Sequence, residues 1–106
     1  MSNKETVRVA FDKVCLAIAN LEAVKTKLAD LHYIAEEVEI SQEVLNKISE
    51  VAEPSSDAHE VVYTRTIRAQ EALRERLSNE SRQSLADKLG AAYNATNEAF
   101  VNIRKV

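Results

Sequence analysis

Residues that make tight turns are almost missing from this sequence, because its 106 residues include one glycine and one proline. Sandwiches and barrels need a turn about every 8–12 residues, so this scarcity excludes all-β folds and repeated strand–helix units. A single glycine also excludes the glycine-rich loops that cradle phosphate groups. The single cysteine excludes an internal disulfide. We therefore expect one all-α domain spanning residues 1–106.

Long hydrophobic runs and an excess of positive charge are missing as well. The longest stretch without a charged residue runs only from residue 89 to residue 97, and a bilayer crossing needs about 20 apolar residues. The first eight residues mix both charges and lead into no apolar segment, so no secretory signal is visible. The formal net charge of −3 leaves no overall basic footprint for nucleic acid. These absences predict a cytoplasmic protein with no membrane partner.

Groupings that carry catalysis or hold metals are also not found. The only two histidines, His32 and His59, follow Ala29 and Ser56 by three positions, where a di-iron helix bundle needs glutamate. One cysteine and two distant histidines do not supply a zinc spacing. We interpret the acidic group at residues 36–39 as a solvated or salt-bridged helix face. The sequence thus predicts no enzyme activity and no cofactor.

What the sequence does contain is apolar residues at steps of three and four, the spacing of one helix face. Such stripes predict helices that pack in the manner of a coiled coil. We expect Cys15, next to one stripe, to be a small buried hydrophobic residue. The stripes comprise Val7, Phe11, Val14, Ile18, Leu21 and Leu28; then Ile34, Val38, Ser41, Leu45, Ile48 and Ala52; then Val62, Thr66, Ala69, Leu73 and Leu77; and finally Ala86, Leu89, Tyr93, Thr96, Phe100 and Ile103.

One strong stop divides the chain near its middle. Proline disfavours helix at the residue before it, so the first helical half should end by Glu53 and the chain should reverse at Pro54. The carboxylate of Asp57, followed three residues later by Glu60, predicts a capping box that starts the second half. Gly90 lies within the last stripe, where it either permits a close backbone approach or is simply tolerated.

Two architectures fit this division. In one, both halves break again and form a four-helix bundle with helices near 4–29, 33–53, 58–78 and 82–105. In the other, two helices of about 50 residues form an antiparallel hairpin about 75 Å long. A bare hairpin exposes half of each apolar stripe, so dimerisation would complete a bundle. We favour the hairpin, because neither glycine nor proline occurs at residues 30–33 or 78–84.

Arginines cluster in the second half, opposite an acidic part of the first half. Fold-back at Pro54 brings Glu43 near Arg65 and Arg68, so internal ion pairing is the simplest interpretation. The alternative is a nucleic-acid-associated regulator that uses the arginine-rich helix 65–76, through Arg65, Arg68 and Arg76.

The predicted function is a non-catalytic protein–protein interaction or regulatory role, exerted through an amphipathic helix face. Its predicted partners are a second copy in a homodimer, another protein, or both. Apolar residues outside the main stripes are the candidate partner-facing residues: Val44, Val61, Tyr63, Ile67 and Val101. The length and helical pattern are similar to those of small secreted proteins with a Trp-x-Gly turn, but this chain has no tryptophan. No family is therefore assigned.

Overall fold

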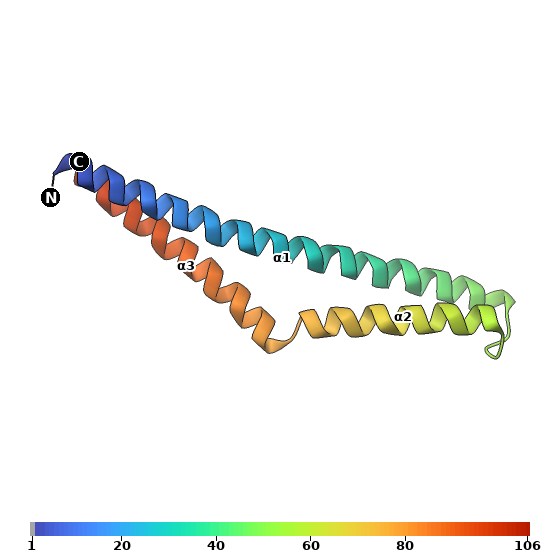
Figure 1. The fold of residues 1–106 in the computed structure, drawn as a ribbon. Coiled ribbons are helices and arrows are strands. Elements are labelled where there is room, and N and C mark those ends of the chain that lie inside the picture. The colour runs from blue at the N-terminus through green and yellow to red at the C-terminus, as the bar shows by residue number, and fades with distance from the viewer. Residues whose placement is uncertain (1) are drawn as a thin grey trace. The chain divides into compact units, whose positions relative to one another are not determined.

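Residues 2–106 are described by a computed structural model, and they form three α-helices (Figure 1). These are α1 (Asn3–Val51), α2 (Asp57–Arg76) and α3 (Asn79–Arg104). None of the described residues lies in a strand. The predicted all-α class is therefore confirmed.

Contacts divide the helices into two units. The terminal unit consists of the residues up to Lys27 together with Arg82–Val106, and the central unit consists of Leu28–Ser81. The division falls inside α1, so the first part of this helix packs with α3 and the second part packs with α2. Each unit is therefore a packed pair of helical segments.

Helix α1 continues for 49 residues because nothing within it interrupts the backbone hydrogen bonds. The side chain of Ser2 caps its start, where Oγ accepts a hydrogen bond from the Glu5 amide at 3.2 Å. At the other end, Ala52 still donates to the carbonyl of Ile48, and the helix stops just before Pro54. Proline restricts the residue before it to extended conformations, which explains this stop.

The start of α2 corrects the predicted capping box. The N-cap residue is Ser56, not Asp57, with extended backbone angles of φ −71° and ψ 149°. Its Oγ accepts a hydrogen bond from the amide of His59 at 3.2 Å. Asp57 is instead the first residue of the helix, where its negative charge is favourable beside the positive end of the helix dipole.

The second half of the chain contains a further break, at Leu77 and Ser78. The amide of Ser78 bonds to the carbonyl of Glu75 at 3.2 Å, which tightens the last turn of α2. The Oγ of Ser78 then accepts from the amide of Ser81 at 3.3 Å and so caps α3. A serine side chain that satisfies free amides competes with a continuous helix. The polar residues that begin with Ser78 therefore break the helix.

Neither predicted set of helix boundaries is correct throughout. Residues 30–33 do not break α1, which contradicts the four-helix version in the first half. The break at residues 77–78 contradicts two helices of about 50 residues in the second half. Residues 30–33 differ from residues 77–78 because Asp30 does not cap a helix. Its carboxylate accepts a hydrogen bond from Arg76 Nε at 2.7 Å instead.

In the central unit, the packed faces are the predicted stripes. Thr66 is 1% exposed, and Ser41 and Ala69 are also buried. The Oγ1 of Thr66 donates to the carbonyl of Val62 at 2.9 Å or of Ser41 at 3.3 Å, so its hydroxyl is satisfied. Contacts join residues 49 and 59, 41 and 66, and 30 and 76, which is the order of an antiparallel pairing. The remaining members of the two stripes are half-buried: Ile34, Val38, Leu45, Ile48, Ala52, Val62, Leu73 and Leu77.

In the terminal unit, the packed faces are not the predicted stripes. The start of α1 lies beside the end of α3 (Figure 1). The side chains of Lys13 and Glu98 form an ion pair across the two helices. Small residues make up most of the contact between the helices, which lets the backbones come close. The buried residues are Thr6, Ala10, Ala17 and Val24 of α1, and Ala92, Ala95 and Ala99 of α3.

Candidate interaction surfaces

The large apolar side chains of the terminal unit lie on its surface. Nine of them are 45–68% exposed, and we call this set the apolar face: Val7, Phe11, Val14, Ile18 and Leu21 of α1, and Leu89, Tyr93, Phe100 and Ile103 of α3. The favoured hairpin expected the stripes to form the contact between the helices, with half of each stripe exposed. The first part of this prediction is wrong here, because alanines occupy the contact between α1 and α3.

The two stripes lie on the same side of the helix pair. Each stripe is displaced by one residue from the buried row of its helix, for example Phe11 from Ala10 and Phe100 from Ala99. One residue is about 100° of rotation around a helix. The helices α1 and α3 run in opposite directions. A shift of one residue toward the C-terminus therefore turns the stripe of α1 and the stripe of α3 toward the same side of the helix pair. The apolar face is therefore continuous across both helices.

The opposite side of the terminal unit has a different composition. The exposed side chains there include Asp12, Asp87 and Glu98, of which Glu98 directly precedes the buried Ala99, and the large exposed apolar side chains there are Leu16 and Val101. Charge and polarity on one side, and large apolar residues on the other, make the pair of helices amphipathic as a whole. Val101, one of the predicted partner-facing residues, thus belongs to the polar side.

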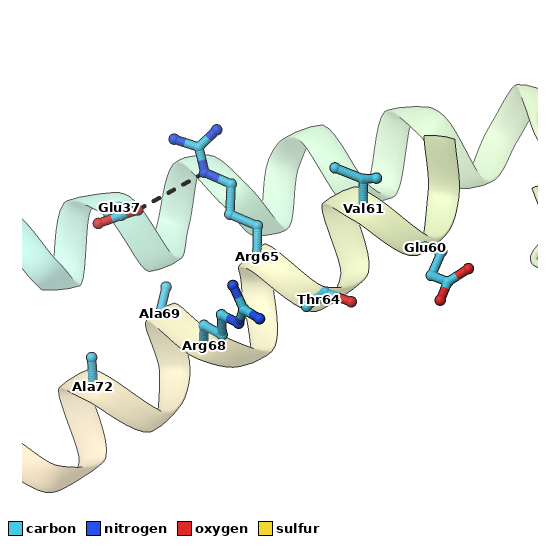
Figure 2. A pocket seen from close by; sticks show the side chains of 8 residues that line it. All are labelled: Glu37, Glu60, Val61, Thr64, Arg65, Arg68, Ala69 and Ala72. Atoms are coloured by element: carbon cyan, nitrogen blue, oxygen red, sulfur yellow. Dashed lines mark ion pairs between the residues drawn. The ribbon is translucent and has the colours of Figure 1, made fainter. Parts of the chain in front are cut away.

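A shallow depression of about 600 Å³ lies on the central unit (Figure 2). Its lining includes Val61, Arg65 and Arg68 of α2, and Glu37 of α1. A second depression of about 290 Å³ is lined by Tyr33, Ile40, Val44, Val62 and Arg65, among others. The first depression therefore brings together Val61, Arg65 and Arg68, and the second brings together Val44 and Arg65.

The arginines of the central unit meet carboxylates of α1. Arg65 Nε lies 3.9 Å from an oxygen of Glu37, and Figure 2 shows the arginine side chain directed across to that residue. Arg76 Nε lies 2.7 Å from Asp30, and an Arg76 terminal nitrogen also donates to the carbonyl of Ala72. Both pairs are about half exposed or more, so each contributes at most about 1 kcal/mol to stability. Arg76 does not line the depression that Arg65 and Arg68 share.

The remaining predicted residues of the central unit lie apart from that depression. Tyr63 is half exposed and stacks against the ring of His59, with 6.3 Å between the ring centroids. Together with Pro54 and Glu60, these two rings line a depression of about 300 Å³ near the start of α2. Ile67 is half-buried and lines none of the three depressions.

One pair of side chains resembles part of a catalytic arrangement. The Oγ of Ser49 lies 3.2 Å from Nε2 of His59, and this hydrogen bond joins the end of α1 to the start of α2. Catalytic serine–histidine pairs have a third group that orients the imidazole. Among residues 2–106 no carboxylate makes a hydrogen bond or ion pair with His59, so the contact links the two helices without forming such a triad.

Two further residues differ from expectation or resolve an open alternative. Cys15 is exposed, which contradicts its predicted burial, because the buried row of α1 runs through Ala10 and Ala17. A side chain added at Gly90 would meet nothing within 4 Å. Close backbone approach within this chain therefore does not explain the glycine.

Among residues 2–106, no three histidine, cysteine, aspartate or glutamate side chains converge in a way that could hold a metal ion. None of the helices described combines the length and hydropathy that crossing a membrane requires. No protein family model, no curated protein and no solved structure matches this chain.

Proposed function

We propose that this protein acts without catalysis, by binding other protein surfaces through an amphipathic helix face, and that it self-associates. In this proposal the chain is an antiparallel helical hairpin that reverses around Pro54, and a homodimer completes its helical bundle. With one cysteine and no internal disulfide, it fits a reducing compartment, and we propose a cytoplasmic small regulatory or adaptor protein.

The observation that carries the proposal is the distribution of large and small apolar residues in the terminal unit. Alanine makes up most of the buried contact between α1 and α3, while phenylalanine, tyrosine, isoleucine and leucine lie in solvent. Burying a Phe, Leu or Ile side chain is worth roughly 1.5–3 kcal/mol. A surface with this much unused hydrophobic stabilisation is typical of an interaction site.

The alternative, a nucleic-acid-associated regulator, gains no comparable support. Arg65 lies near Glu37 and Arg76 near Asp30, so two of its three candidate residues already face carboxylates. A phosphate backbone would have to compete with those negative charges. This competition disfavours nucleic-acid binding by the arginines.

Sedimentation velocity over a concentration range from low micromolar to several hundred micromolar tests the proposal. We expect the sedimentation coefficient to rise with concentration toward that of a dimer. A chain that remains a monomer throughout this range would contradict self-association.

A further inference from the structure

The apolar face of the terminal unit has the properties of an interface between two copies of this chain. We propose that a second copy binds there with its own apolar face, so that α1 packs against α1 of the second copy in the antiparallel direction. The two-fold axis crosses the helices near residue 14 of α1. This inference rests on the proposed self-association and specifies the surface and orientation that produce it.

The size of the face matches what a stable dimer needs. Nine side chains that are 45–68% exposed present on the order of 900 Å² in total. Specific protein interfaces bury about 800 Å² on each partner, whereas the largest apolar patch of a typical monomer is about 300–600 Å². The face is thus large enough for one partner of the same size.

The face is also self-complementary along the helices. On α1 the stripe runs from Val7 to Leu21, so its centre is residue 14. On α3 the apolar face runs from Leu89 to Ile103, so its centre is residue 96. The ion pair of Lys13 with Glu98 places these two centres within about one turn of each other.

One two-fold axis perpendicular to the helices therefore serves both stripes. On α1, the antiparallel arrangement brings Val7 opposite Leu21 of the second copy, and Phe11 opposite Ile18. On α3, it brings Leu89 opposite Ile103 of the second copy, and Tyr93 opposite Phe100. Large side chains meet large side chains at every level, as in the core of a four-helix bundle.

Charges beside the α1 stripe select this orientation. Arg8 and Glu22 both follow stripe residues by one position, both are exposed, and neither belongs to an ion pair among residues 2–106. Arg8 lies seven residues before Cys15 and Glu22 lies seven residues after it. Cys15 itself is close to the proposed axis, so the two charges are placed symmetrically about that axis. In the antiparallel arrangement, Arg8 of each copy therefore faces Glu22 of the other.

The competing orientation has its two-fold axis parallel to the helices, so that α1 of one copy faces α3 of the other. Residues at the same position along the helix axis then meet. The Lys13–Glu98 ion pair shows that residue 8 lies at the height of residue 103 or 104. Arg8 would then face Arg104 of the second copy, and this contact would occur twice. Like charges at such contacts disfavour association, so charge favours α1 against α1.

The first experiment compares two neighbouring residues of α1 with similar exposure on opposite sides of the terminal unit. Ile18 is 53% exposed on the apolar face, and Leu16 is 48% exposed on the polar side. By sedimentation equilibrium, we expect Ile18→Asp to raise the dimer dissociation constant by roughly a hundredfold or more, since each copy would bury a charge. We expect Leu16→Asp to change it by less than about threefold. Equal effects, or a larger effect of Leu16→Asp, would overturn the inference.

The second experiment leaves the apolar contacts intact and tests orientation, so it remains decisive even if Ile18→Asp loses helical structure. At low salt, Arg8→Glu and Glu22→Arg should each weaken the dimer roughly fivefold to thirtyfold, and the double variant should recover to within about threefold of the parent. The competing orientation predicts that Arg8→Glu strengthens the dimer, because glutamate would then face Arg104. That result, or a double variant no better than the singles, would rule out α1 against α1.

The two proposals fail in different ways. A chain that is monomeric at all concentrations contradicts both the proposed self-association and this interface. A dimer that is insensitive to Ile18→Asp and Arg8→Glu contradicts only the interface, and self-association then uses another surface.

Discussion

Alanine at the contact positions of the terminal unit decides which side of each helix is buried. Ala92, Ala95 and Ala99 of α3 are nearly inaccessible, and so are Ala10 and Ala17 of α1. Their small side chains let the two helices come close, so there is no room between the helices for the leucines and phenylalanines that lie one residue away. Packing at this contact therefore comes from close backbone approach and not from large side chains.

A leucine at one of these positions tests the close approach. Ala95→Leu should lower the free energy of unfolding by about 1–3 kcal/mol, because the added side chain must push the helices apart. Ala91→Leu, at an exposed position one turn earlier on the same helix, should change it by less than about 0.5 kcal/mol. Urea denaturation of both variants at one protein concentration measures the difference. Equal stabilities would contradict the close packing of α1 against α3.

Single serines define the helix ends in the second half of the chain. Ser56 caps α2 through the amide of His59, and Ser78 caps α3 through the amide of Ser81. In the first half, Asp30 pairs with Arg76 and α1 continues past it. Helix boundaries here therefore depend on whether a side chain satisfies free amides of the backbone or pairs with another helix.

A substitution at Ser56 tests whether Ser56, and not Asp57, is the N-cap residue of α2. We expect Ser56→Ala to destabilise the protein by about 1 kcal/mol, the usual cost of losing an N-cap serine. Ser55→Ala, at the neighbouring exposed residue, should be almost neutral. Thermal denaturation followed by circular dichroism checks both variants. A larger loss for Ser55→Ala, or none for Ser56→Ala, would contradict the assigned cap.

At the scale of the whole molecule, the proposed dimer couples folding to association. A surface of nine partly exposed large apolar residues gains its stabilisation only when a partner covers it. The stability of such a chain must then depend on its concentration, since binding of a partner to the folded state favours that state.

This coupling predicts a melting temperature that rises with protein concentration. Each tenfold increase adds about 1.4 kcal/mol to the apparent stability of the dimer, about 0.7 kcal/mol per chain, and this raises the melting temperature by about 3–6 °C in a chain of this size. The Ile18→Asp variant should melt at a lower temperature that does not depend on concentration. Calorimetry at several concentrations measures both, and a constant melting temperature for the parent chain would contradict the coupling.

Two sets of site residues were predicted from the sequence, and both stay predictions. In the central unit, the partner-facing candidates Val44 and Val61 and the nucleic-acid candidates Arg65 and Arg68 line two surface depressions. In the terminal unit, Phe11, Tyr93 and Phe100 were assigned to the stripes that join the helices, but they lie on the surface beside the contact. The missed signal was a second row of small residues beside each stripe, which also recurs at helical spacing.

The sequence by itself determined that the chain is helical and that the first helix ends before Pro54. These outcomes are local, since they depend on helix periodicity, on the scarcity of glycine, and on the restricted backbone before proline. Only the tertiary structure decided which of two neighbouring rows on α1 is buried. Both rows fit the helical period equally well, and the alanines of α3, which are far away in the sequence, select the row of small residues. The large residues are left on the surface, and this packing choice creates the face that we assign to a second copy.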